Sequence, residues 1–229
     1  MNLCIDIETI ACSSIGRLKY LADHLKPPAN YKTDTAIDKW RLTAKEKMIE
    51  NTSFDGSSGE IITIGYAVGN EPAKVLQRDD TTSERKIIQE FFDDLKVVCE
   101  KNNISSSYSP FTWIAHNAAF DLPFLFKRCV INSLNINTHG IAIPHNQRHG
   151  NGKVFCTMTE WMGFGAKAGG SLDNICNALG MDGKGDFDGS MVGAAFENGE
   201  FKKIADYCLS DVANTLEIYN RFKAVSHGV

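Results

Sequence analysis

The chain has 229 residues, enough for one substantial hydrophobic core, and its 43% hydrophobic and 23% charged residues are ordinary for a folded globular protein. This composition excludes a disordered or fibrous chain, and no apolar run approaches the roughly 20 residues that a membrane-spanning helix requires. The net charge of -4 argues against a protein held on nucleic acid by bulk electrostatics, but it leaves room for an acidic pocket that receives phosphates through bound metal ions. We therefore expect a single soluble domain over residues 1–229, without a membrane segment or signal peptide.

The cysteines indicate whether the protein occupies a reducing or an oxidising cellular compartment. Seven cysteines are scattered along the chain, and no two of them are spaced as Cys-x-x-Cys. Odd, scattered cysteines in apolar segments are typical of reduced, buried thiols rather than of disulfides or a zinc site. We therefore expect a cytoplasmic protein.

Residues 1–10 form an apolar strand pattern that Asp6 and Glu8 interrupt. Side chains two residues apart on a strand point to the same face. Two carboxylates there repel each other and are costly to desolvate, and a divalent cation such as Mg²⁺ or Mn²⁺ removes that penalty. Alone, such a pair is more often a solvated strand edge or cap, so a metal site needs partners elsewhere in the chain.

The segment 13–51 lacks strand character, and apolar residues recur at helical spacing between positions 37 and 48. We expect a mostly helical insertion packed near the first strand. It is either a surface excursion that protects the core or a lid beside a site.

The middle of the chain alternates strands and helices. A β-branched run at 61–68 predicts a buried strand, and 73–77 is a plausible hairpin partner. An N-cap within 81–83 precedes a helix with one apolar stripe.

A second polar cluster follows the short apolar strand predicted at 111–115. His116 and Asn117 lead into a helix that carries Asp121 in its first turn. Strand-to-helix junctions are where α/β folds place their sites, although a carboxylate in a first helical turn is also favoured by the helix dipole alone.

The segment 132–152 is expected to be a flexible loop. It contains His139, His145 and His149, but without cysteine or carboxylate companions a mobile surface loop is favoured over a metal cluster.

The chain then resumes a strand pattern at 154–157 and a short capped helix at 171–180. The glycine-rich stretch 182–193 is expected to be a loop, in which Lys184 either touches phosphate or is solvated.

A long helix is predicted from about 199 to 225. Tyr207 and Asp211 are four residues apart and therefore neighbours on one face of it. The pair is common by chance, and its significance depends on the other acidic residues.

Three motifs together resemble the DEDD superfamily of 3′–5′ exonucleases, in its tyrosine-bearing (DEDDy) subclass. They are Asp6-Ile7-Glu8-Thr9, the stretch 116–121 that ends in Asp121, and the stretch 207–211 that joins Tyr207 to Asp211. The chain is similar to standalone exonucleases that resemble the proofreading exonuclease domain of family B DNA polymerases. The resemblance covers most of the chain, and the histidine-containing loop is its least matched part.

The resemblance implies an α/β, ribonuclease H-like fold, in which helices flank a mixed sheet of about five strands. Because the sequence ends directly after the third motif, we expect an exonuclease without its own polymerase domain.

The resemblance also implies a two-metal-ion mechanism with Mg²⁺ or Mn²⁺, in which one ion activates the attacking water and the other stabilises the leaving 3′ oxygen. Asp6 would bridge the ions, Glu8 and Asp211 would complete the site on the nucleophile side, and Asp121 would help hold the other ion. Tyr207 would orient the attacking water. The product would be a nucleoside 5′-monophosphate.

The expected partner is the 3′ end of a single strand, with DNA favoured and RNA possible. We expect Thr9 and Ile10 to meet the terminal nucleotide, Phe120 to provide an apolar contact and Asn117 to bond the backbone. His116 is either a substrate contact or a hydrogen bonder that stabilises its junction, and Phe120 and Ile10 are equally explained by core packing.

Three other functions stay open on the sequence. The same site degrades RNA in related families, and selection through the 2′-hydroxyl cannot be read from these motifs. A catalytically silent nucleic-acid-binding module would keep the fold, although none of the four acids is lost. A nucleotide phosphohydrolase would act on free nucleotides and ignore oligomers.

Overall fold

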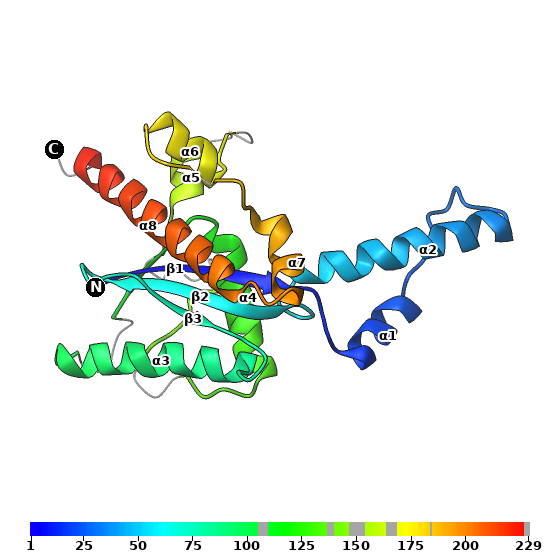
Figure 1. Ribbon diagram of the computed structural model, residues 1–229, viewed down its shortest axis with the longest axis horizontal. Coiled ribbons are helices and arrows are strands. Elements are labelled where there is room, and N and C mark those ends of the chain that lie inside the picture. The colour runs from blue at the N-terminus through cyan, green and yellow to red at the C-terminus, as the bar shows by residue number, and fades with distance from the viewer. Residues whose placement is uncertain (105–109, 137–139, 147–153, 164–168, 184, 227–229) are drawn as a thin grey trace.

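The structure is a computed structural model that describes residues 1–104, 110–136, 140–146, 154–163, 169–183 and 185–226. The predictions on His139, His149 and Lys184 lie outside these residues. A mixed sheet in the order β3-β2-β1-β4-β5 forms the centre (Figure 1). Its strands are β1 (Asn2–Ile10), β2 (Glu60–Val68), β3 (Lys74–Gln77), β4 (Thr112–Ala115) and β5 (Val154–Cys156).

The central strand β1 pairs antiparallel with β2 and parallel with β4, and β5 continues the sheet parallel to β4. Parallel neighbours need a crossover, and α3 (Glu84–Lys101) supplies it between the β2–β3 hairpin and β4. A mixed five-stranded sheet flanked by helices is the architecture that the sequence predicts.

The two faces of β1 have different neighbours because its side chains alternate. Leu3, Ile5 and Ile7 pack into the main core with α3 and α4 (Ala118–Ile131). Cys4 packs on the opposite face with Val212 of α8 (Phe201–Ser226). Asp6 and Glu8 share the face of Cys4, so they lie on the side of the sheet that α8 covers.

Four shorter elements complete the domain: α5 (Thr157–Met162), α6 (Leu172–Ala178), η4 (Gly189–Met191) and α7 (Val192–Glu197). Neither α5 nor α7 is predicted from the sequence, which gives strand at 157 and loop up to 193. Both are six residues long, too short to show a helical period. Val192 and Ala195 bury α7 in a cluster with Ile62 and Ile204, and this packing stabilises it.

The segment predicted as a flexible loop has a packed part. Ile141 and Ile143 are buried in the main core, and the His145 ring stacks on Phe126 with centroids 3.5 Å apart. The described residues 140–146 are therefore held against the domain.

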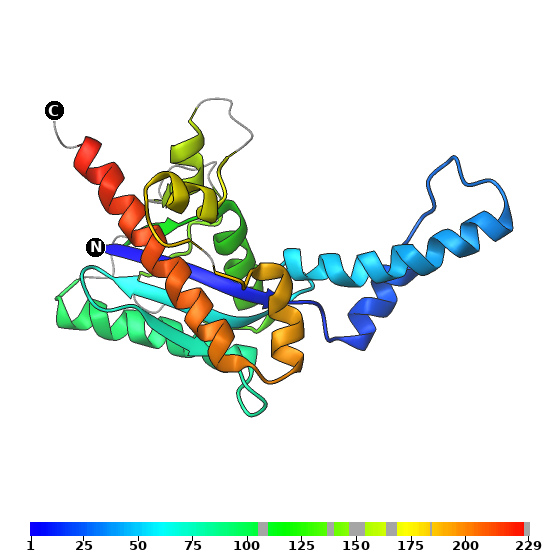
Figure 2. The same cartoon turned by 45° about the horizontal axis from the view of Figure 1, so that its top comes forward.

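The segment 13–51 forms α1 (Ile15–Asp23) and α2 (Asp34–Asn51), followed by the turn η1 (Thr52–Phe54). From the sequence, this segment is expected to pack near the first strand, but the two helices extend away from the sheet in both views (Figures 1 and 2). Neither helix contains a buried residue. Leu21, Trp40 and Met48 line a cavity beside these helices, whereas Ile15 and Leu42 are exposed.

Among the described residues, no helix is both long and apolar enough to cross a bilayer. All seven cysteines are buried free thiols.

Candidate active site

Asp6 and Glu8 occupy the sheet face beneath α8. In the register of β1 and β2 they lie opposite Gly65 and Thr63, and an irregularity follows directly after Glu8. Glu8 is only 8% exposed. The alternation of β1 therefore places two acids together in a largely buried position.

Gly65 allows α8 to approach these acids closely. A Cβ atom at this position would lie 2.7 Å from Cys208 Sγ and 3.0 Å from Val212 Cγ2, closer than atoms normally approach. Because glycine has no side chain, the α8 backbone can lie directly on β2. This contact positions Tyr207 and Asp211, which flank Cys208 and Val212 on α8.

Asp121 reaches the same place from the junction between β4 and α4. It lies in the first turn of α4 and is 4% exposed, and its carboxylate accepts a hydrogen bond from the backbone N–H of Ile7 in β1. Burial, followed by the negative charge of Asp6, raises the pKa of Asp121 well above its ordinary value. Asp211, also 4% exposed, adds to this effect. Concentrated negative charge is therefore the main electrostatic property of the site.

These elements enclose a pocket of about 390 Å³. Its lining includes all five residues predicted to be catalytic and three of the five predicted substrate contacts: Asp6, Glu8, Asp121, Tyr207, Asp211, His116, Asn117 and Phe120. The pocket brings together residues from β1, the β4–α4 junction and α8 that are up to 205 positions apart in the chain.

Thr9 and Ile10 are not among the described residues that line this pocket. The Thr9 hydroxyl donates a hydrogen bond to the carbonyl of Ser53 at 2.7 Å, which ties the end of β1 to η1. Ile10 packs against the cluster that contains Ile62 and Ile204. Their contact with a terminal nucleotide stays a prediction.

The three substrate-contact candidates in the pocket differ in their surroundings. His116 is tied to β5 and α5, because its Nδ1 lies 2.9 Å from Thr157 Oγ1 and its carbonyl accepts a hydrogen bond from the N–H of Met158. Phe120 is half-buried against Phe124. The side chain of Asn117 does not cap α4. The alternative in which His116 stabilises its junction agrees with these contacts.

Tyr207 is held as a neutral phenol. Burial, followed by the charges of Asp211, Glu8 and Asp6, raises the pKa of its hydroxyl far above the ordinary value, and the hydroxyl hydrogen-bonds to Asp211. Its ring packs edge-on against Phe187, with centroids 5.2 Å apart. In the metal-free protein Tyr207 is therefore a neutral hydroxyl that hydrogen-bonds to Asp211.

Sequence reasoning missed Cys208 as a member of the site. Its Sγ donates a hydrogen bond to Asp6 Oδ2 at 3.3 Å. Burial, followed by the charges of Asp6 and Glu8, raises the pKa of this thiol well above its ordinary value, so it stays protonated. A protonated thiol orients a carboxylate and is a poor ligand for a hard cation.

Five further lining residues are not predicted as site residues from the sequence: Ile7, Met158, Ser171, Leu172 and Asp173. Ser171 caps α6, and Asp173 adds a fifth carboxylate to the pocket. The sequence signal was the capped start of α6, but nothing local in the sequence shows that this helix end faces β1.

The donor set suits divalent cations. One carboxylate oxygen of Asp6 and one of Glu8 lie within 4.8 Å of each other, beside Cys208 Sγ, and Asp121 and Asp211 line the same pocket. Carboxylate oxygens are the ligands that Mg²⁺ and Mn²⁺ prefer, and a cation there would relieve the repulsion that raises the pKa of Asp121. The residues present therefore fit a metal-binding site.

Comparisons with known proteins agree with this geometry. Residues 59–229 match a family described as "Predicted 3'-5' exonuclease related to the exonuclease domain of PolB". The chain is also similar to the solved structure of the family B DNA polymerase from the hyperthermophilic archaeon Pyrobaculum calidifontis, with a TM-score of 0.55 and 14% sequence identity over 96% of this chain. The match spans 24% of the polymerase chain, so it shows the ribonuclease H-like α/β fold and not the activity of a polymerase. No curated protein matches the chain.

Proposed function

Because the chain belongs to the family of predicted 3′–5′ exonucleases related to the exonuclease domain of PolB, we propose that it hydrolyses phosphodiester bonds at the 3′ end of single-stranded nucleic acid. DNA is the favoured substrate and RNA the alternative. The observation that carries the proposal is the meeting of Asp6, Glu8, Asp121 and Asp211 with Tyr207 in one pocket.

The four carboxylates are proposed to hold two divalent ions, Mg²⁺ or Mn²⁺. When bound, such ions supply water activation and stabilise charge on the leaving oxygen. Asp6 is the proposed shared ligand, because its charge is the largest of those that act on Asp121 and it also acts on Tyr207. Cys208 keeps the Asp6 carboxylate oriented through its hydrogen bond.

Tyr207 is proposed to orient the attacking water. Its raised pKa keeps the proton on the hydroxyl, and its hydrogen bond to Asp211 directs it toward the acids. Packing on Phe187 fixes the ring. Such fixed orientation contributes to catalysis because water attacks in line with the bond that breaks.

The proposed reaction adds one water molecule across the terminal phosphodiester. The water oxygen forms a bond to phosphorus, the bond from phosphorus to the 3′ oxygen breaks, and a proton ends on that oxygen. The products are a nucleoside 5′-monophosphate and a strand one nucleotide shorter with a free 3′-hydroxyl. Phe120 and Asn117, which line the pocket, are the proposed contacts to the terminal nucleotide.

The seven buried free thiols support a reducing compartment, and we propose a cytoplasmic enzyme.

The test is a polarity assay on 5′-labelled single strands of DNA and RNA, with Mg²⁺, Mn²⁺ or a chelator. The proposal predicts a ladder that shortens from the 3′ end only with metal, and no shortening of a strand whose 3′ end carries an inverted nucleotide. Preferential loss of the RNA strand would establish the ribonuclease. A folded, metal-supplied protein that degrades neither polymer but binds both would refute the exonuclease and favour the binding module.

A further inference from the structure

The projecting helices present an interaction surface. We call residues 13–51 the arm. Its helices contain no buried residue, and Ile15 and Leu42 are 84% and 71% exposed. A nine-residue helix such as α1 is marginal in water without a packing partner. Apolar groups collected on one exposed feature of a protein mark a binding surface.

The arm, together with Thr52, Asp55 and Ser58, lines a cavity of about 670 Å³ that shares no lining residue with the acidic pocket. The residues that line it include the apolar Leu21, Leu25 and Met48, the aromatic Tyr31 and Trp40, and Lys47. The Tyr31 and Trp40 rings lie 6.3 Å apart and are tilted by 54°, and Tyr31 is 37% exposed. Aromatic faces beside a lysine are the groups that stack bases and contact phosphates in single-strand binding proteins.

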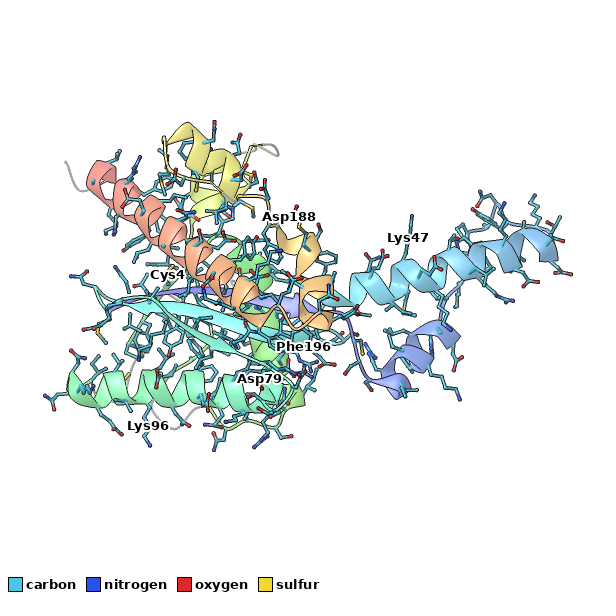
Figure 3. The ribbon with its side chains drawn as sticks, in the orientation of Figure 1. Cys4, Lys47, Asp79, Lys96, Asp188 and Phe196 are labelled. Atoms are coloured by element: carbon cyan, nitrogen blue, oxygen red, sulfur yellow. The ribbon has the colours of Figure 1, made fainter. Side chains whose placement is uncertain are left out.

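The charge of the arm is opposite to that of the rest of the chain. Residues 13–51 contain eight lysines and arginines and five carboxylates, a net charge of +3. The remaining residues contain 16 basic and 23 acidic side chains, a net charge of -7. Lys47 projects from α2 (Figure 3). A polyanion is therefore attracted to the arm and repelled by most of the remaining surface.

The arm is fixed next to the strand that carries the acids. It begins five residues after Glu8. At its base the N–H of Cys12 donates to Thr52 Oγ1 at 2.8 Å, and Arg17 Nε donates to Ser58 Oγ at 3.0 Å. The base of the arm is therefore held at the end of β1, the strand that also carries Asp6 and Glu8.

From these observations we infer that the arm cavity binds the single-stranded nucleic acid upstream of its 3′ end. The inference rests on the proposed exonuclease function, and it adds a second binding site for the same strand. Its consequence is a dependence on length: long strands contact both the acidic pocket and the arm, whereas short strands contact the pocket alone.

The test measures binding of 5′-fluorescent oligonucleotides of about 4 to about 20 nucleotides by anisotropy, in the Asp121→Asn background so that the strand is not degraded. Trp40→Ala is expected to weaken binding of the long strand by roughly 5- to 150-fold, the effect of losing one stacked base, and to leave the short strand unchanged. Lys47→Ala is expected to lower the slope of log affinity against log salt by about 0.7. Lys96→Ala on α3 removes one positive charge far from the arm (Figure 3), and this control should leave the slope of the parent unchanged.

Folding of each variant is checked by its melting temperature. If folded Trp40→Ala and Lys47→Ala proteins bind the long strand as tightly as the parent, the inference is wrong. If Trp40→Ala instead dissociates an oligomer without changing strand affinity, the cavity binds a second copy of the chain and the inference is also wrong. Metal-dependent cleavage of the short strand by the protein with Asp121 intact tests the proposed function separately, because that strand does not reach the arm.

Discussion

A methyl group at Gly65 would lie where α8 meets the sheet, and this makes Gly65→Ala a test of how the site is positioned. Its Cβ would be 2.7 Å from Cys208 Sγ, 3.0 Å from Val212 Cγ2 and 3.3 Å from the Cys208 carbonyl oxygen. The 2.7 Å contact with the Cys208 side chain forces a displacement, and the 3.3 Å contact with the helix backbone is tighter than usual. We expect α8 to move away from β2, and Tyr207 and Asp211 to move with it.

The magnitude follows from overpacking of a buried contact, which costs about 1–3 kcal/mol of folding free energy. For a chain of this size that lowers the melting temperature by roughly 2–12 °C. The catalytic rate should be more sensitive than the stability, because a displacement of about 1 Å at a catalytic group lowers the rate on the order of 100-fold. The kcat for removal of the terminal nucleotide should therefore fall more than KM rises.

The assay compares the melting temperature and the single-turnover cleavage rate of Gly65→Ala with those of Gly193→Ala. A Cβ at Gly193 meets nothing within 4 Å, so this variant should keep both properties or gain slightly in stability. The double variant Gly65→Ala/Cys208→Ala removes the closest atom. Its free energy of unfolding should be about 0.5–3 kcal/mol higher than the sum of the two single effects predicts. Wild-type stability and rate in Gly65→Ala would refute the view that close helix–strand contact positions the site.

Three further predictions follow from single side chains. Asp121→Asn should abolish cleavage and raise the free energy of unfolding of the metal-free protein by about 0.5–2 kcal/mol at neutral pH. Because the pKa of Asp121 in the folded protein is raised above its ordinary value of 3.8, the free energy of unfolding of the wild type should fall as pH rises from about 4. Denaturation at several pH values should show a flatter dependence of this free energy on pH in the variant. Glu84→Ala should lose about 3–5 kcal/mol in urea unfolding, since the buried Arg128 guanidinium loses both hydrogen bonds to this carboxylate; a loss below about 1 kcal/mol would contradict this. Tyr207→Phe should keep its packing on Phe187 and its melting temperature while kcat falls about 10- to 100-fold, and an unchanged kcat would rule out the proposed water-orienting role.

The sequence predicts features of the fold that depend on local periodicity. Asp6 and Glu8 share a face because a strand repeats every two residues, and Tyr207 and Asp211 are neighbours because a helix repeats every 3.6 residues. The order of strands and long helices follows from the same patterns. Resemblance to a known family then connects these local groups into one candidate site.

Contacts between distant elements are not contained in such patterns. The hydrogen bond from Cys208 to Asp6 joins residues 202 positions apart, and Asp173 enters the pocket only because α6 turns its first residues toward β1. The absence of a side chain at Gly65 matters only because α8 packs against this position.

The short helix α7 and the packing of the helical insertion 13–51 are not predicted from the sequence, for a related reason. The helix α7 has six residues and is stabilised by tertiary packing rather than by its own period. In the arm, helical spacing predicts a helix but does not show which surface covers its apolar side. Neither helix contains a buried residue, and Leu21, Trp40 and Met48 line a cavity.

The most direct test of the proposed active site is a comparison of Asp211→Asn with Asp206→Asn. Both acids lie on α8, but Asp211 is buried in the acidic pocket, whereas Asp206 is exposed and pairs with Lys202. The measurement is the single-turnover rate at which nucleoside 5′-monophosphate is released from a single-stranded DNA with Mn²⁺. We predict that Asp211→Asn lowers this rate by a factor on the order of 1,000 or more and that Asp206→Asn leaves it within about twofold of wild type. Equal rates for the two folded variants, whether both fast or both absent, would contradict the assignment of catalysis to this pocket.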